Sequence, residues 1–254
     1  MPEPVEFSSR WFLSRGTGAA ARVFCFPHAG GNARLFLNWQ PAMGSDAQIV
    51  AVCPPGRGPR TDEPAPATFA DLADGAAEAI RSLGDAPTYL YGHSLGALVA
   101  FEVARRLPAP RDLVVSGLAA PSLMPTRRAV EIAQLDGHAF VAAVASYGGL
   151  PSEILAVEDA YHLLLPGLQA DFRLIQSYRY IPGPPLNAGL TIINGRDDPN
   201  VDTATLAPWA QEFTSPPRYH WVDGGHFFLE SQPDAIVEVM RRLMRSDLQH
   251  AELI

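Results

Sequence analysis

The stretch Gly92-His93-Ser94-Leu95-Gly96 decides the fold of this chain of 254 residues. An apolar run, residues 88–91, precedes it, and a segment of helical character, residues 97–106, follows it. A serine between two glycines at a strand-to-helix turn is the context of a nucleophile elbow. Glycine is needed on both sides, because a Cβ at Gly92 or Gly96 would crowd the adjacent strand or helix.

The alternative interpretation of this stretch is a chance match in an ordinary turn. At average composition a Gly-x-Ser-x-Gly sequence arises in about one chain in ten of this length. The flanking strand and helix make coincidence rarer still, so we interpret Ser94 as a nucleophile. Leu95 stands at the start of the helix, where its backbone N–H can point at a developing oxyanion.

Strand-like and helix-like segments alternate along the rest of the chain. Strand-like runs lie at 22–26, 48–52, 88–91, 112–118, 190–194 and 219–222, and helical patterns at 35–39, 68–83, 97–106 and 233–244. Thr68 is the expected N-cap of the second helix. Continuous apolar strands separated by helices predict an α/β fold with a mostly parallel central sheet covered by helices on both faces.

Residues 126–180 interrupt this alternation, because they contain helical patterning and no convincing strand. Helical pieces are expected at 131–146, 155–165 and 171–178. We expect a single domain over residues 1–254, with residues 126–180 inserted between two strands as a helical lid over the strand ends. Some of its apolar side chains would line a channel, although most would complete a core.

Composition narrows the class of protein. The formal net charge is −8, from 19 Lys and Arg against 27 Asp and Glu, which argues against a nucleic-acid binder. Cys25 and Cys53 lie in apolar runs, where buried reduced thiols are expected. The N-terminal residues lack the pattern of a signal peptide, and no apolar stretch is long enough for a membrane helix. We therefore expect a soluble cytoplasmic protein that does not bind membranes.

A serine nucleophile needs a general base, normally a histidine oriented by a carboxylate. His226 is the best candidate for the base, because it follows the last strand in a glycine-containing loop, residues 223–227. His93 is next to Ser94 and is expected to point away from it and to pack against neighbouring residues. His28 is expected to shape its own loop rather than to transfer protons.

The carboxylate should follow a strand that precedes the strand before His226. Asp198 fits, because Pro199 favours an extended conformation at that position. Asp197 is either a helper or a solvated loop charge, and Asp223 is more simply a turn former. The order serine, aspartate, histidine is that of the α/β-hydrolases. The second oxyanion donor is then expected in the loop after the first clear strand, and we assign it to the N–H of Ala29.

These segments together resemble the type II thioesterases, the stand-alone editing enzymes of polyketide and non-ribosomal peptide assembly lines. The resemblance extends from about Arg22 to Met240. It rests on the ordered segments Phe26–Gly31, Pro54–Arg60, Gly92–Gly96, Leu165–Phe172, Gly195–Pro199 and Gly224–Phe228.

The resemblance implies an α/β-hydrolase fold with Ser94, Asp198 and His226 as catalytic triad and Ala29 and Leu95 as oxyanion hole. It implies a substrate acyl group on the phosphopantetheine arm of an acyl or peptidyl carrier protein, and a reaction without cofactor or metal ion. Nothing in the sequence demands a dimer, so a monomer is expected.

Two further points follow from this resemblance. The arginines expected near a docked carrier protein, or else solvated in loops, are Arg57, Arg60, Arg127 and Arg128. Two other functions keep the same fold: a general carboxylesterase, and a partner of the assembly line that binds or transfers acyl groups without releasing free acid.

Overall fold

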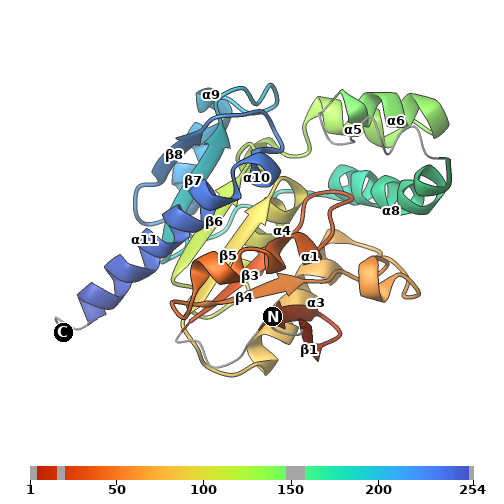
Figure 1. Ribbon diagram of the computed structural model, residues 1–254. Coiled ribbons are helices and arrows are strands. Elements are labelled where there is room, and N and C mark those ends of the chain that lie inside the picture. The colour runs from red at the N-terminus through yellow and green to blue at the C-terminus, as the bar shows by residue number, and fades with distance from the viewer. Residues whose placement is uncertain (1–4, 16–20, 147–157, 252–254) are drawn as a thin grey trace.

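A computed structural model describes residues 5–15, 21–146 and 158–251 of the chain. Within these residues eight strands form one sheet in the order β1-β2-β4-β3-β5-β6-β7-β8 (Figure 1). The strands are β1 Val5–Ser9, β2 Phe12–Arg15, β3 Arg22–Phe26, β4 Gln48–Val52, β5 Thr88–His93, β6 Asp112–Ser116, β7 Gly189–Gly195 and β8 Arg218–Val222.

The six strands from β4 to β8 in this order pair parallel to one another. The antiparallel edge strands β1 and β2 complete the sheet, and the sequence patterns did not predict them. In β2 the consecutive residues Phe12 and Leu13 are both fully buried, so the strand lacks the apolar–polar alternation by which a half-buried strand is recognised.

Successive residues of the parallel strands face opposite sides of the sheet, and each side has its own layer of helices. Phe24 and Leu90 belong to the apolar core beneath α3 Phe69–Ser82 and α4 Leu95–Ala104. Val23 and Tyr91 belong to the second core, under α1 Arg34–Leu37, α2 Gln40–Met43 and α11 Pro233–Ala251. This arrangement confirms the predicted α/β-hydrolase fold.

The sequence between β6 and β7 contains the helices α5 Arg127–Ala133, α6 Gly137–Ala145 and α8 Glu158–Ser177. These three helices, called the insertion below, lie together at one side of the molecule, away from the two helical layers (Figure 1). Two short helices, α9 Thr203–Leu206 and α10 Phe228–Ser231, follow β7 and β8.

The helix boundaries within the insertion differ from the prediction. The piece expected at 131–146 is two helices, α5 and α6, separated at residues 134–136, and part of the piece expected at 155–165 lies outside the described residues. The remainder of that piece and the piece at 171–178 belong to one helix, α8, which continues through Pro166. Buried contacts of Leu168 and Phe172 with the α6 residue Phe140 outweigh the helix-breaking preference of proline.

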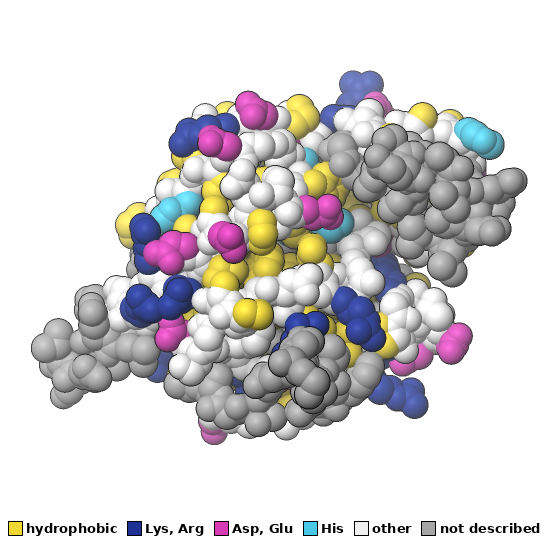
Figure 2. All heavy atoms as spheres, in the orientation of Figure 1, with side chains coloured by type: hydrophobic (Ala, Val, Ile, Leu, Met, Phe, Trp, Pro, Cys, Tyr) yellow, Lys and Arg dark blue, Asp and Glu magenta, His cyan; other side chains and the backbone are white. Residues whose placement is uncertain are grey.

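Charged side chains of both signs lie side by side on the face around α11 (Figure 2). Arg241 and Arg245 of this helix both pair with Asp46, and Arg242 pairs with Glu238. Within the described residues, no helix is both long and apolar enough to cross a membrane.

The start of α3 provides a test of the fold. Thr68 Oγ1 accepts a hydrogen bond from Asp71 N at 3.1 Å, and Asp71 Oδ2 accepts one from Thr68 N at 3.0 Å. Because Thr68→Ala removes half of this capping box, we expect it to lower the free energy of unfolding by about 1 kcal/mol. Urea denaturation measures the change. Thr203→Ala, at an exposed helix position, is the control, and an equal loss there would contradict the assignment.

Candidate active site

Ser94 occupies the turn between β5 and α4 in a strained backbone conformation. Its φ is 53° and its ψ −119°, and among the described residues it is the one non-glycine residue with a positive φ. A Cβ on Gly92 would overlap the backbone of Gly96, and a Cβ on Gly96 would overlap the carbonyl of Phe26. The sequence-based expectation that both flanking positions require glycine is therefore confirmed. Strain of this kind concentrates at functional sites.

The backbone N–H groups of Ala29 and Leu95 belong to two segments that meet at Ser94. Ala29 follows β3, Leu95 begins α4, and both residues line the same cavity as Ser94. In the described part of the chain, neither N–H has a hydrogen-bond acceptor. Such N–H groups can bind a negatively charged oxygen, as an oxyanion hole requires.

His226 and Asp198 lie together at the ends of the neighbouring parallel strands β8 and β7. The Nδ1 atom of His226 is 2.8 Å from Asp198 Oδ2, and the two side chains are only 4% and 0% exposed. The other carboxylate oxygen, Oδ1, accepts a hydrogen bond from Asn200 N at 2.9 Å. Both oxygens of Asp198 therefore have donors, which holds the carboxylate in one orientation toward the imidazole.

The loops that carry Asp198 and His226 are packed against each other through backbone contacts. Asp197 N donates to Gly224 O at 3.0 Å, and Arg196 N donates to Val222 O at 2.9 Å. Gly195 has no room for a Cβ, because the carbonyls of Gly224 and Gly225 lie against it. The exposed side chain of Asp223 pairs with Arg196, so Asp198 is the carboxylate that reaches His226.

Two further histidine rings, His28 and His93, lie near His226. The ring centroids of His93 and His226 are 5.1 Å apart, and those of His28 and His93 are 5.9 Å apart. Burial and the proximity of His226 lower the pKa of His28 to about 4 and hold the pKa of His93 well below its ordinary value. Both neighbours are therefore neutral near pH 7, and neither competes with His226 as a base.

His93 is fully buried, as the sequence analysis predicted. Its Nδ1 lies 2.8 Å from Ser116 Oγ, which is also 2.9 Å from the hydroxyl of Tyr91. The backbone of Ser116 accepts a hydrogen bond from Ser94 N at 2.8 Å. Through these contacts, Ser116 of the neighbouring strand β6 helps to hold the strained turn in place.

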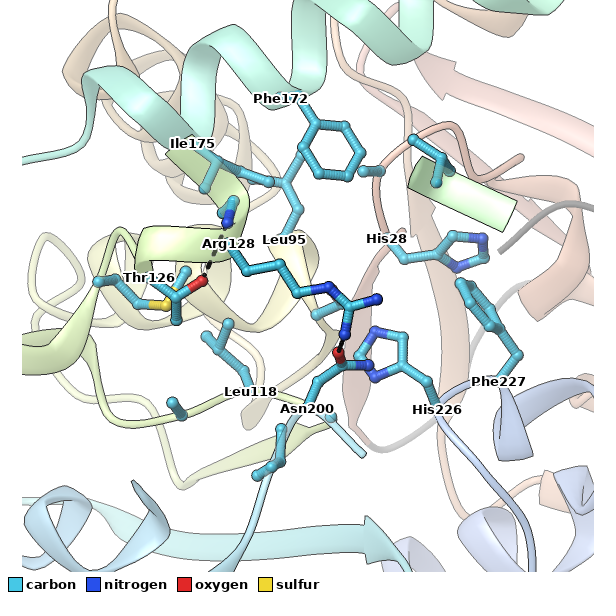
Figure 3. A pocket seen from close by; sticks show the side chains of 18 of the residues that line it. His28, Leu95, Leu118, Thr126, Arg128, Phe172, Ile175, Asn200, His226 and Phe227 are labelled. Atoms are coloured by element: carbon cyan, nitrogen blue, oxygen red, sulfur yellow. Dashed lines mark hydrogen bonds between the residues drawn. The ribbon is translucent and has the colours of Figure 1, made fainter. Parts of the chain in front are cut away.

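A cavity of about 220 Å³ opens above Ser94 and His226. Phe172 and Ile175 of α8 project into it, and Phe227 and His28 lie across from them (Figure 3). Other apolar side chains that line it include Leu118, Met124, Val144, Leu168 and Val201. The cavity is therefore suited to an apolar group attached to the atoms that react at Ser94.

Three polar residues, Thr126, Arg128 and Asn200, also line the cavity. Of these, the sequence analysis singled out only Arg128, as one of the arginines expected near a docked carrier protein. Arg128 extends across the cavity toward Asn200, which lies beside His226 (Figure 3). Its Nη1 donates to Asn200 Oδ1 at 2.9 Å, and its Nη2 donates to Ser146 Oγ at 2.9 Å. No local motif places Thr126 or Asn200 in the cavity, because the contact between Arg128 and Asn200 depends on α5 lying above the loop after β7.

The expectations for Arg57 and Arg60 need correction. Arg57 forms a buried ion pair with Asp171, and its side chain is 12% exposed. Arg60 pairs with Glu63, donates to Cys53 O and stacks on Trp11. Neither is a solvated loop residue or available to a docking protein, because each is held by internal partners. Arg127 is exposed and pairs with Glu131.

Cys25 and Cys53 are free, buried thiols, as predicted. Among the described residues, no group of three or more His, Cys, Asp or Glu side chains could hold a metal ion.

The backbone strain at Ser94 can be tested by comparing the unfolding free energies of two variants. Ser94→Gly is expected to unfold with a free energy about 1 kcal/mol larger than Ser94→Ala, because only glycine adopts this backbone without a steric cost. Both variants lack the hydroxyl, so their difference in thermal denaturation reports the steric cost of this backbone conformation for a residue with a Cβ. Equal melting temperatures would contradict a strained turn.

Comparisons with known proteins were consistent with this geometry. The sequence model described as "Thioesterase domain" matches residues 21–244. A "Probable cadicidin biosynthesis thioesterase" from Streptomyces griseus is 34% identical over 232 residues, which are 90% of this chain and 63% of that protein. "Thioesterase PikA5" from Streptomyces venezuelae is 33% identical over 84% of this chain and 77% of its own length.

A solved structure described as the type II thioesterase BorB from the borrelidin biosynthetic cluster superposes with a TM-score of 0.85. Its sequence is 30% identical, and the superposition covers 94% of this chain and 99% of that one.

Proposed function

The chain belongs to the thioesterase domain family, and we propose that it releases acyl groups from the phosphopantetheine arm of acyl or peptidyl carrier proteins. The observation that carries the proposal is the meeting of Ser94, the His226–Asp198 pair and two backbone N–H groups at one end of an apolar cavity. The relatives named for biosynthetic clusters support this class of substrate. A cytoplasmic location, alongside the carrier proteins, is part of the proposal.

We assign each residue a role in acyl transfer. Ser94 Oγ attacks the thioester carbonyl while His226 accepts the serine proton, and Asp198 orients the imidazole and stabilises its cationic form. The N–H groups of Ala29 and Leu95 bind the carbonyl oxygen as it becomes negative. Collapse of this intermediate breaks the C–S bond, and the departing sulfur takes the proton from His226, which is then neutral again for the second half of the reaction. The pantetheine thiol has a pKa near 8.5, so it needs little help to leave.

The second half of the reaction uses the same groups. His226 removes a proton from a water molecule, and the resulting hydroxide attacks the acyl-serine carbonyl. The ester bond breaks, Ser94 takes back a proton from His226, and a free carboxylic acid leaves. Every proton is accounted for by serine, histidine, water and thiol, so the proposed route requires no cofactor or metal ion.

The insertion is proposed to act as the lid of this site, within a single domain. Leu168, Phe172 and Ile175 of α8 and Val144 of α6 form one wall of the cavity, so the insertion completes the acyl-binding space. Arg128 and Asn200 add polar groups to an otherwise apolar wall. The enzyme is proposed to act as a monomer, because these residues form the cavity from one chain.

The role of Asp198 leads to a matched pair of variants. Asp198→Asn is expected to reduce kcat on an acyl-pantetheine thioester by at least about 10³-fold, because the imidazole then loses its orienting carboxylate. Asp197→Asn makes the same change at the neighbouring, exposed aspartate and is expected to keep wild-type activity. Steady-state kinetics with both variants decides the assignment, and similar losses in the two would contradict it.

The substrate class is tested on loaded carrier proteins. Wild-type enzyme is expected to convert acyl-carrier protein to free acid and unloaded carrier, seen by mass spectrometry, while Ser94→Ala leaves the acyl-carrier intact. Oxoesters of equal chain length are expected to be poorer substrates by kcat/KM.

Two results would overturn the substrate proposal. Faster hydrolysis of oxoesters, with no gain from the carrier, would indicate a general carboxylesterase. Retained function in Ser94→Ala without release of acid would indicate an acyl-binding or acyl-transferring partner.

A further inference from the structure

Asp171 lies in α8, at the boundary between the insertion and the loop that follows β3. It is completely buried, and its Oδ2 accepts a hydrogen bond from Gly30 N at 2.8 Å. Its carboxylate also forms an ion pair with Arg57, from the loop after β4. Three segments far apart in the sequence therefore meet at one carboxylate, and none of the roles assigned above uses it.

Gly30 is the residue next to Ala29, whose N–H is the proposed second oxyanion donor. Within the described part of the chain, the bond from Gly30 N to Asp171 is the one hydrogen bond that joins residues 27–31 to an element outside their own loop. The position of the Ala29 peptide therefore depends on α8, whereas the Leu95 N–H is fixed by the buried helix α4.

Packing reinforces the same contact. Gly30 has a φ of 70°, and a Cβ at this position would lie 2.8 Å from Leu168 Cδ1. Leu168 and Asp171 are three residues apart on α8 and so share one helix face, on which Leu168 covers the loop and Asp171 binds its backbone. Ala29 itself packs against the apolar cluster that contains Leu168 and Phe172.

The electrostatics favour an ionised carboxylate at neutral pH. Burial raises the pKa of Asp171 to about 6, although Arg57 and the Gly30 N–H both oppose this rise. Above that pH the bond from Gly30 N is a hydrogen bond to a charged acceptor, which is stronger than a bond to a neutral one.

We propose that Asp171 is a positioning residue for the oxyanion hole: α8, through Asp171 and Gly30, holds the Ala29 N–H in its working orientation. The residue contacts neither substrate nor Ser94 and acts through the loop. The inference rests on the proposed function, since it concerns how that site is assembled. It also gives the insertion a part in the chemistry as well as in binding the acyl chain.

The test uses two double variants that both remove the buried charges. Arg57→Gln/Asp171→Asn keeps a side-chain oxygen that can accept from Gly30 N, whereas Arg57→Met/Asp171→Leu has no acceptor. Neither leaves an unpaired buried charge, and apolar replacement of a buried ion pair is often neutral for stability. Circular dichroism and thermal denaturation establish that both fold. If either double variant fails to fold, Asp171→Asn and Asp171→Ala repeat the comparison.

We expect the Arg57→Met/Asp171→Leu variant to lose about 10- to 100-fold in kcat on an acyl-pantetheine thioester, with KM within about threefold of wild type. Complete removal of one oxyanion donor costs about 10²–10³ in kcat, and a displaced donor should cost less. The Arg57→Gln/Asp171→Asn variant is expected to stay within about threefold of wild-type kcat. Asp136 is an exposed aspartate that precedes α6 and pairs with Arg173 of α8, and Asp136→Asn, as the matched control, should not change kcat.

Inhibitor binding separates positioning from a merely structural role. A trifluoromethyl ketone analogue of the acyl-pantetheine forms a tetrahedral oxyanion on Ser94, and its affinity should fall in parallel with kcat/KM in the variant without an acceptor. The unreactive amide analogue, which places no charge in the oxyanion hole, should bind as it does to wild type.

Three results can be distinguished. Wild-type kcat in the folded Arg57→Met/Asp171→Leu variant would overturn this inference alone. Equal weakening of both inhibitors would also overturn it, because the residue would then support only the cavity. Wild-type hydrolysis by Ser94→Ala would instead contradict the proposed function itself.

Discussion

The contact between the elbow and the end of β3 is the constraint on which the rest of the site depends. Gly96 lies against the Phe26 carbonyl so closely that a methyl group cannot be placed between them. This contact brings the first turn of α4 beside the loop that leaves β3. Because β3, β5, β7 and β8 belong to the parallel part of the sheet, their carboxyl ends share one edge, where Ala29, Ser94, Asp198 and His226 gather.

The two histidines near His226 are neutral, and this simplifies the electrostatics of the site. His28 and His93 have low pKa values because they are buried beside a third imidazole. Both rings are therefore uncharged near neutral pH. Of the three histidines, only His226 contacts the carboxylate of Asp198. In the proposed acyl transfer, Asp198 would balance the positive charge on His226, without repulsion from a second imidazolium.

Much of this architecture could be predicted from local sequence. Six apolar runs predicted the six parallel strands, and Thr68 marked the start of α3. The glycines around Ser94, and the order of serine, aspartate and histidine along the chain, predicted the candidate residues. Local patterns were enough because each feature is set by a turn or by a periodic run of side chains.

Features that depend on distant partners could not be predicted. Arg57 stands between glycine residues in a proline-rich segment that suggests a solvated loop, and only the fold brings Asp171 to it. The continuity of α8 through Pro166 depends on contacts with α6, and the place of Arg128 in the cavity depends on α5 lying above Asn200. In each case contacts between distant parts of the chain outweigh the conformation that the local sequence favours.

The two proposed oxyanion donors are anchored in different layers of the molecule. Leu95 N–H belongs to a helix whose every residue is buried against the sheet, so its direction is set by the core. The Ala29 peptide is held by α8, on the face that also sends Leu168, Phe172 and Ile175 into the cavity. An acyl chain bound as proposed would contact the same helix face that fixes the loop. Binding of the chain and alignment of the donor are therefore physically linked through α8.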